Sequence, residues 1–339
     1  MRPAKQRLIR RHTPLDEAPP HEVLSAQDFQ EGKVLAAYAK YVVHQAVVKV
    51  GRPSLSGEMS VGSLCSGSEM ASVAIDALGS ALVDQAVPIN FRTSFCCESV
   101  EGRRKWCQAV VDKLHPGSDT CVYNDITTLM GSASHCTRHG QACQVEEHFD
   151  GCIVGFSCKD ASKANPNRGK LAASVLTTPT SAGGTNDTIH GALKVIDQRL
   201  PEWLLLENSD TLDDADHAAG LELLLNALAS RGYDPMPFLI DASEYGLPQV
   251  RKRMYILSVL RPARRLTIAN YTLYCEKVKE LLVLFKVQGP DLLSVLLPDD
   301  SAVLGNELAN RLSRGPPRGW DSSTIDNHRR EWTKMGLRW

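Results

Sequence analysis

Short apolar runs alternate with longer segments of helical periodicity along most of the chain. Runs of strand length occur at 61–67, 91–99, 120–125, 149–156, 202–208 and 253–260. Segments with apolar residues at three- and four-residue spacing, typical of amphipathic helices, occur at 31–50, 69–82, 100–114, 190–200 and 218–232. Strands that alternate with helices predict an α/β fold, in which a mostly parallel sheet carries helices on both faces.

Two polar stretches, 130–148 and 159–188, interrupt this alternation. Loops of that length in a compact domain are usually functional or disordered. After about residue 263 the chain combines a Leu-rich helix, Pro-containing turns and a Trp- and Arg-rich end. We therefore predict an N-terminal tail and helix at 1–55, an α/β domain at 56–263 and a short C-terminal region at 264–339.

Composition narrows the class of protein. With 43% hydrophobic and 23% charged residues, the chain can build a core and solvate its surface, as a globular protein does. The formal net charge of -1 provides no global positive field, so a polyanion would have to bind at a local basic patch. The apolar runs fall far short of the roughly 20 residues that a membrane span needs, and we predict no membrane association.

The ten cysteines are scattered along the chain, and several lie within apolar runs, as reduced and buried thiols do. This usage favours an intracellular compartment. The basic segment at 1–12 lacks the apolar stretch of a secretion signal, and the acidic residues that follow it argue against a transit peptide. The segment fits a solvated tail or a nuclear address, and we expect an intracellular, nuclear protein.

Polar or small residues stand at the carboxyl ends of the first three predicted strands. Gly67 and Ser68 lead from the first strand into a helix, Glu98 follows the second strand and Asp125 follows the third. A carboxylate in such a place can accept hydrogen bonds from a ribose diol or an exocyclic amine. A single acid there is more often a helix cap, but three such positions in succession favour a nucleoside-containing cofactor.

The fourth strand leads into Ser157, Cys158 and Lys159. Cationic neighbours lower the pKa of a thiol and raise its thiolate fraction, so Cys158 is a candidate nucleophile. A buried structural cysteine is the alternative at this position. The segments that follow favour the nucleophile.

A carboxyl group and two guanidinium groups complete the candidate chemistry. Glu207 ends the next strand, and Gln249, Arg251 and Arg253 alternate along a further segment, which would place them on one face of a strand. A thiol, a carboxyl and guanidinium groups are the residue types that covalent activation of a pyrimidine ring would need.

Over residues 60–260 the chain resembles the cytosine-5 DNA methyltransferase family, in that family's motif order. The segments that carry the resemblance are SLCSGSE, FCCESVEGRR, YNDI, GFSCKDAS, HGALKVI, LLLENSD and YGLPQVRKRMYIL. The resemblance implies a Rossmann-like, S-adenosylmethionine-dependent methyltransferase fold over 56–263, with 264–339 as a reduced target-recognition element. The sequence departs from the family at Ser157, where the family has proline, and at Cys65, where an aromatic residue is usual.

The resemblance also implies a covalent mechanism on a cytosine that is flipped out of DNA. Cys158 would attack ring carbon 6, Glu207 would hold or protonate ring nitrogen 3, and Arg251 and Arg253 would bind the carbonyl oxygen. Carbon 5 would then take a methyl group from S-adenosylmethionine. The residues expected to bind this cofactor are Cys65, Gly67, Ser68, Glu98, Asp125, Ile126, Ser157 and Leu193.

Basic residues around the predicted catalytic mouth are candidates for contacts with nucleic acid. The residues expected to bind nucleic acid are Lys159, Lys163, Arg168, Lys170 and Gln249, and Arg261, Arg264 and Arg265 would extend the same basic rim. Two alternatives to DNA methylation stay open, because the C-terminal region is short and the cofactor motif diverges. One is cytosine-5 methylation of transfer RNA, and the other is a catalytically weak nucleic-acid-binding module; protein partners are not predicted.

Cysteine and histidine residues also cluster within the polar stretch 130–148, at His135, Cys136, His139, Cys143 and His148. Such residues can ligate zinc. However, the stretch has no paired CxxC motif, and adjacent His135 and Cys136 are awkward ligands for one tetrahedral ion. The sequence therefore predicts no metal site.

Overall fold

The computed structural model describes residues 24–30, 32–53, 55–158, 185–215, 217–261 and 270–290, with single positions at 295 and 330. Its strands are β1 (Gly57–Leu64), β2 (Ile89–Cys97), β3 (Cys121–Tyr123), β4 (Ala133–Cys136), β5 (Gln141–Gln144), β6 (Gly151–Val154), β7 (Trp203–Ser209), β8 (Tyr233–Asp241) and β9 (Lys252–Leu260). Its helices are α1 (Ala26–Gln30), α2 (Val34–Val50), α3 (Met70–Asp84), α4 (Glu101–Leu114), α6 (Thr185–Arg199), α7 (Ala218–Ser230) and α8 (Tyr271–Leu284).

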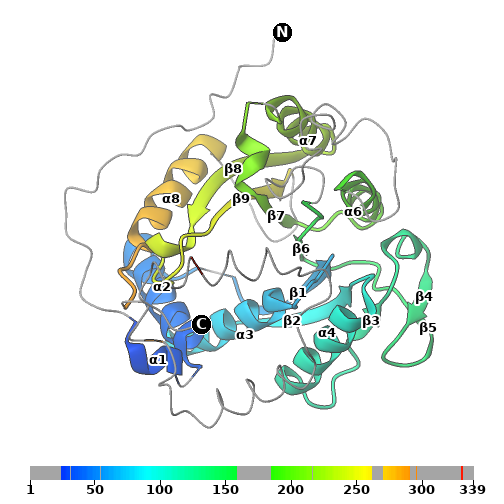
Figure 1. Cartoon of the computed structure of the whole chain (residues 1–339), viewed down its shortest axis with the longest axis horizontal. Helices are drawn as coiled ribbons and strands as arrows, with labels where there is room; N and C mark the ends of the chain where they lie inside the picture. Colours follow the sequence, from blue (N-terminus) through cyan, green and yellow to red (C-terminus); the bar gives the residue numbers. More distant parts are fainter. Residues whose placement is uncertain are drawn as a thin grey trace. The chain divides into compact units, whose positions relative to one another are not determined.

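The strands form one nine-stranded sheet in the order β5-β4-β3-β2-β1-β6-β7-β9-β8 (Figure 1). The five central strands β3, β2, β1, β6 and β7 are parallel, whereas β9 runs antiparallel to both of its neighbours. From β1 the chain proceeds outward through β2 and β3, and it then returns to β6 on the other side of β1. The order thus reverses between β1 and β6, which is where open α/β sheets bind their ligands.

Helices cover both faces of the sheet, as predicted from the alternation of strand-like and helical segments in the sequence. Two adjacent residues of β2 show this, because successive side chains of a strand point to opposite faces. Cys96 packs with Cys107 of α4, whereas Cys97 belongs to the larger core that includes α6 and α7. Right-handed crossovers in opposite directions from β1 place the two groups of helices on opposite faces.

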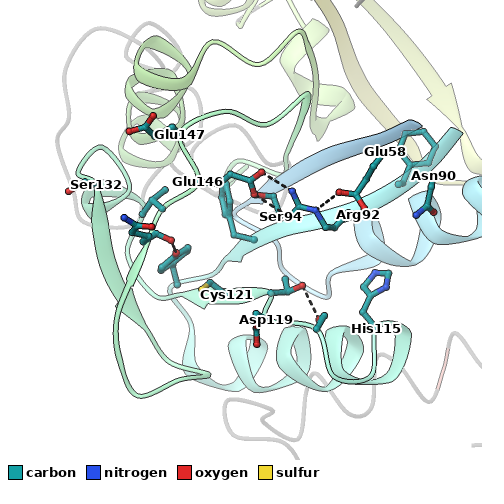
Figure 2. Close-up of a pocket in the computed structure, with 17 residues that line it drawn as sticks. Glu58, Asn90, Arg92, Ser94, His115, Asp119, Cys121, Ser132, Glu146 and Glu147 are labelled. Carbon is teal, nitrogen blue, oxygen red and sulfur yellow. Dashed lines mark hydrogen bonds and ion pairs between the residues drawn. The ribbon is translucent and has the colours of Figure 1, made fainter. Parts of the chain in front are cut away.

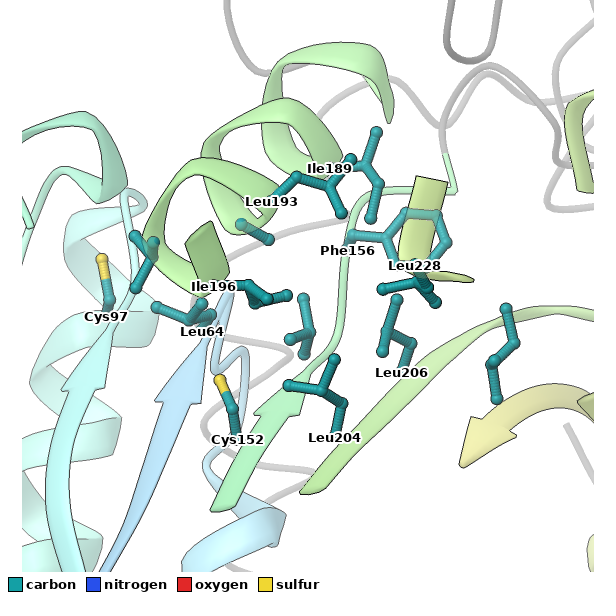
Figure 3. Close-up of a cluster of buried hydrophobic side chains, with 14 of the residues drawn as sticks. Leu64, Cys97, Cys152, Phe156, Ile189, Leu193, Ile196, Leu204, Leu206 and Leu228 are labelled. Carbon is teal, nitrogen blue, oxygen red and sulfur yellow. The ribbon is translucent and has the colours of Figure 1, made fainter. Parts of the chain in front are cut away.

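The larger core lies between the sheet and helices α6 and α7 (Figure 3). Leu204 and Leu206 of β7 are fully buried there against the β6 side chains, and Ile196 of α6 closes the layer above them. Each such side chain stabilises the fold by roughly 1.5–3 kcal/mol. This rigid layer fixes the carboxyl ends of β1, β6 and β7 relative to one another.

Helices α2 and α8 belong to the same packed unit as the sheet. Tyr38 and Tyr41 of α2 donate their hydroxyl groups to the carbonyl oxygens of Phe285 and Leu284, at 2.9 and 2.8 Å. Apolar side chains of α2 also pack on α3. The chain divides into two units, Met1–Asp291 and Leu292–Trp339, and the boundaries at 55 and 263 stay predictions.

The sequence prediction missed two parts of the sheet. The polar stretch 130–148 contains the β4–β5 hairpin, whose short polar strands carry little apolar alternation. Strand β8 contains Pro235 and Pro237, and proline is unfavourable in a strand unless the strand lies at an edge. The strand order places β8 at an edge, which accommodates both prolines. None of the described helices combines the length and the apolar character that a bilayer span requires.

Candidate active site

One row of paired residues marks the carboxyl edge of the parallel strands. The row runs across the sheet through Tyr123, Cys97, Leu64, Val154 and Leu206. Glu98, Cys65 and Glu207 each come directly after a residue of this row. The sheet register therefore brings the predicted strand-end residues to a common edge, as parallel pairing requires.

The loops after β1 and β6 meet at the point where the strand order reverses. The Gly155 amide donates to the Leu64 carbonyl oxygen at 3.1 Å. A side chain at position 155 would begin only 3.2 Å from the carbonyl oxygen of Cys65. Gly155 thus allows the two loops that carry the predicted cofactor and nucleophile residues to approach each other closely.

The loop after β1 has an unusual backbone. Cys65, Gly67 and Glu69 have φ angles of 54°, 58° and 55°, in the left-handed region that suits glycine but costs other residues about 1–3 kcal/mol. Burial, with a contribution from the charge of Glu98, raises the pKa of the Cys65 thiol to about 12. This shift disfavours the thiolate form of Cys65.

Glu98 is connected directly to the loop after β1. Its carboxylate accepts hydrogen bonds from the Gly67 amide at 2.8 Å and from the Val100 amide at 2.9 Å. A carboxylate has about four acceptor sites, so two remain for a ligand. The Ser68 carbonyl oxygen accepts a hydrogen bond from the indole of Trp106, at 3.0 Å, which ties the same loop to α4.

Asp125 is the N-cap of a short helix in the structure. A helix cap was the alternative to a cofactor ligand that the sequence left open. One carboxylate oxygen accepts from the amide and the hydroxyl of Thr127, at 2.8 and 2.7 Å, and begins a short 3-10 helix. Ile126 packs on α6, which it reaches because Gly191 lacks a side chain. Leu193, two residues further along α6, is 4% exposed and belongs to the core, so little of it is open to a cofactor (Figure 3).

The segment after β6 presents Cys158 at the surface. Ser157 donates its amide to the Thr188 hydroxyl of α6 at 3.0 Å. Asn208 of β7, which is 2% exposed, donates its side-chain amide to the carbonyl oxygen of Phe156 at 3.0 Å and reaches that of Ser157 at 3.5 Å. These contacts hold the backbone that leads to the candidate nucleophile.

Sequence reasoning gave Asn208 no role, although it is the second residue of the Glu-Asn pair in LLLENSD. Its position directly after Glu207 was the available signal. The structure shows that one dipeptide serves two purposes, because Asn208 positions the Cys158 segment and Glu207 faces the arginines. The predicted nucleic-acid residues Lys159, Lys163, Arg168 and Lys170 lie outside the described residues, as do Arg264 and Arg265.

Glu207 and Arg253 form an ion pair across β7 and β9, with 3.1 Å between Oε1 and Nε. Burial raises the pKa of the Glu207 carboxyl above its usual value, while the charges of Arg253 and Arg251 oppose the shift. A carboxyl group with a raised pKa beside a guanidinium can donate a proton or a hydrogen bond to a ring nitrogen.

Two predictions about the arginine segment are wrong. Gln249 and Arg251 precede β9, which begins at Lys252, so they do not share a strand face with Arg253. Because β9 runs antiparallel to β7, its end lies at the amino edge of the parallel strands. Arg261 is therefore at the opposite edge from Cys158, where it pairs with Asp234 and lies 5.2 Å from the Tyr271 ring centre.

A pocket of about 770 Å³ also lies at the amino edge of the parallel strands, opposite the edge that carries Cys158 and Glu207 (Figure 2). Arg92 spans it, pairing with Glu58 at 2.8 Å and with Glu146 at 2.7 Å. Arg92, Glu58 and Glu146 thus already pair with one another. The residues with nucleophilic and acid–base chemistry are instead at the carboxyl edge.

Known proteins resemble this chain over part of its length. Type II methyltransferase M2.ScrFI of Lactococcus lactis subsp. cremoris is 28% identical over 151 residues, which cover 42% of this chain and 40% of that protein. Type II methyltransferase M.BanI of Aneurinibacillus aneurinilyticus is 29% identical over 123 residues, covering 36% and 26%. A solved structure of the S. pombe Dnmt2 methyltransferase aligns with a TM-score of 0.39 and 16% identity, covering 64% of this chain and 56% of that one.

The chain thus spans less than half the length of these curated relatives. Both are bacterial, so they give no support to the predicted nuclear location. The family profile described as C-5 cytosine-specific DNA methylase matches residues 63–292, which is more than half of the chain. The predicted family and the Rossmann-like methyltransferase fold are confirmed: the chain belongs to the C-5 cytosine-specific DNA methylase family.

Proposed function

We propose that this protein methylates cytosine carbon 5 in DNA, using S-adenosylmethionine as methyl donor and Cys158 as nucleophile. One observation carries the proposal: Asn208 holds the backbone next to the exposed Cys158, and its neighbour Glu207 has a raised pKa beside Arg253. Hydrogen bonds and an ion pair therefore connect the segment of Cys158 with Glu207 and Arg253 at the carboxyl edge.

The loops at this edge fit the cofactor by their donors and acceptors. The close approach at Gly155 leaves backbone rather than side chains at the point where the strand order reverses. Glu98 would accept hydrogen bonds from the ribose hydroxyl groups with its remaining acceptor sites, and Asp125 would accept from the adenine amine. Ile126 would contact the adenine ring, with Cys65, Gly67, Ser68 and Ser157 around it. When bound, S-adenosylmethionine supplies an electrophilic methyl group.

The chain's own residues would perform the rest of the chemistry. The Cys158 sulfur would form a bond to ring carbon 6, and the electron pair of the 5,6 double bond would move to carbon 5. Glu207 would give a proton to ring nitrogen 3, while Arg253 would bind the carbonyl oxygen, with Arg251 supporting the same charge. After carbon 5 has gained the methyl group, it would lose its proton to a base, and that electron pair would re-form the 5,6 double bond and expel the Cys158 sulfur. Ring nitrogen 3 would return its proton to Glu207, which restores the ring.

DNA is the proposed substrate because the matching family is described by its action on DNA. Methyl transfer from tritium-labelled S-adenosylmethionine tests the proposal, with duplex DNA, its hemimethylated form and transfer RNA as parallel substrates. We expect label in DNA that digestion recovers as 5-methylcytosine. Label found only in transfer RNA would move the assignment to RNA, and no label from a folded, cofactor-binding protein would contradict the catalytic role.

A further inference from the structure

Three cysteines and one histidine converge at the end of the sheet, away from the candidate active site. Cys121 begins β3, Cys136 ends β4, His139 lies in the turn that follows and Cys143 lies in β5. These elements form the β5-β4-β3 end of the sheet (Figure 1). One ligand atom from each of the four side chains lies within 4.8 Å of all the others.

The distances within this Cys/His cluster have a common centre. Nδ1 of His139 lies 3.7 Å from the sulfur of Cys121, 3.4 Å from that of Cys136 and 3.3 Å from that of Cys143. A ring nitrogen carries one proton or one lone pair, so it cannot form a hydrogen bond with three sulfurs at once. In a tetrahedral zinc site, bond lengths of about 2.3 and 2.05 Å separate sulfur from nitrogen by about 3.6 Å.

We propose that the Cys/His cluster binds one zinc ion, held by Cys121, Cys136, His139 and Cys143. Three sulfurs with one imidazole form a donor set that selects zinc over magnesium or calcium. Four protein ligands would close the tetrahedron, so the site is structural and not catalytic. The Val122 amide donates to the Cys136 sulfur at 3.3 Å, as expected of a hydrogen bond that supports a metal-bound thiolate.

The ion would act as a cross-link between the hairpin and the rest of the sheet. Strands β4 and β5 have four residues each. Strand β5 is mostly exposed and β4 buries only Ser134 and Cys136, so the hairpin buries little apolar surface of its own. Cys121 joins it to β3, which pairs with the central strand β2. The segment that carries Asp125 and Ile126 runs between two of the proposed ligands, Cys121 at the start of β3 and Cys136 at the end of β4, so the ion would join the strands on either side of it.

This proposal departs from the sequence prediction of no metal site, and the structure explains why. The fourth ligand, Cys121, lies outside the polar stretch 130–148 and reaches the hairpin only through β3–β4 pairing. His135 is exposed and adjacent to Cys136 on β4, where successive side chains point to opposite faces. Neither His135 nor His148 belongs to the cluster, which removes the awkward pair of adjacent ligands.

Metal analysis of the purified full chain tests the proposal without reference to catalysis. The chain is purified without a histidine tag and dialysed to remove unbound metal. Its zinc content is then measured by elemental mass spectrometry. We expect about one zinc per chain. His139→Gln and Cys143→Ser should each lower the zinc content at least fivefold, whereas the matched control His135→Gln, on the same hairpin, should retain it.

A second measurement keeps the test decisive if the ligand variants fold poorly. Wild-type chain stripped of metal and given Co²⁺ alone should show the intense visible absorption of tetrahedral cobalt with thiolate ligands, and Zn²⁺ should displace it. Zinc-free wild-type chain that retains neither added Zn²⁺ nor Co²⁺ would overturn the proposal. So would an intact mass showing a disulfide among the three cysteines under native conditions, or equal loss of zinc in His135→Gln.

Discussion

The candidate active site and the Cys/His cluster use thiols of the same sheet in opposite ways. At the carboxyl edge, Cys158 stands exposed in a segment held by its backbone, and Glu207 is a half-buried acid with a raised pKa. At the end of the sheet, three sulfurs and one imidazole face a common point. Placement therefore decides the role of a cysteine: a thiol held singly at an open edge is available for reaction, whereas converging thiols can bind a metal.

Loss of Cys158 should produce the largest effect. Cys158→Ala removes the atom that bonds to the base, so the rate of methyl transfer should fall by about 10³-fold or more. Affinity for S-adenosylmethionine should stay within a few-fold of wild type, measured by calorimetry.

Cys152→Ala provides the matched control. Cys152 is fully buried in β6, and burial raises the pKa of its thiol. Its loss should cost about 1 kcal/mol of stability and leave methyl transfer intact. If Cys152→Ala in a folded protein reduced chemistry as much as Cys158→Ala, the contrast between exposed and buried thiols would fail.

Removal of the acid should come next. Glu207→Gln should lower kcat by about 10²- to 10⁴-fold, the usual contribution of a positioned acid. Because burial raises the pKa of Glu207, its protonated form persists above the usual range, and the wild-type rate should fall as pH rises through that raised pKa. The Gln variant should lose this limb of the pH profile, and Glu222→Gln, at an exposed site on α7, should keep it. An unaltered profile in Glu207→Gln would exclude the residue as the acid.

Loss of the carboxylate that organises the first loop should have a smaller effect. Glu98→Ala removes a charged acceptor worth about 1.5–3 kcal/mol, so affinity for S-adenosylmethionine should fall roughly ten- to hundred-fold. Glu101→Gln, which breaks only an exposed ion pair with Lys105 on α4, should leave the affinity unchanged. Equal affinity in Glu98→Ala and wild type would remove Glu98 from the cofactor site.

Metal removal should give the smallest effect on the active site, since it acts through the loop between β3 and β4. A chelator that strips zinc should weaken S-adenosylmethionine binding a few-fold, and added Zn²⁺ should restore it. Metal loss with unchanged cofactor affinity would show that the Cys/His cluster stabilises the hairpin without influence on Asp125 and Ile126.

The sequence predicted that the strand-end residues share one edge of the sheet, because parallel pairing brings successive strand ends together. Glu98 and Gly67 are far apart in the chain, yet the register joins them by a hydrogen bond. The sequence pattern did not predict the direction of each strand. Alternation of apolar residues is the same for parallel and antiparallel strands, so Arg261 was expected at the wrong edge.

The complete set of ligands in the Cys/His cluster could not be predicted from the sequence pattern. Spacing within 136–143 supplied three of its ligands, but Cys121 belongs to a buried strand whose pattern indicated only a core position. The partnership between β3 and a polar hairpin has no signature in hydrophobic periodicity. Only tertiary pairing brings the Cys121 sulfur to the other three ligand atoms.

Covalent trapping would show directly whether Cys158 forms a bond to the target base. In duplex DNA that contains 5-fluorocytosine, fluorine replaces the proton that must leave carbon 5, so the sulfur cannot depart after methyl transfer. With S-adenosylmethionine present, the wild-type chain should form a stable protein–DNA adduct, and peptide mapping should locate the bond at Cys158; Cys158→Ala should form none. An adduct at another cysteine, or no adduct from folded chain that binds the cofactor, would contradict the account.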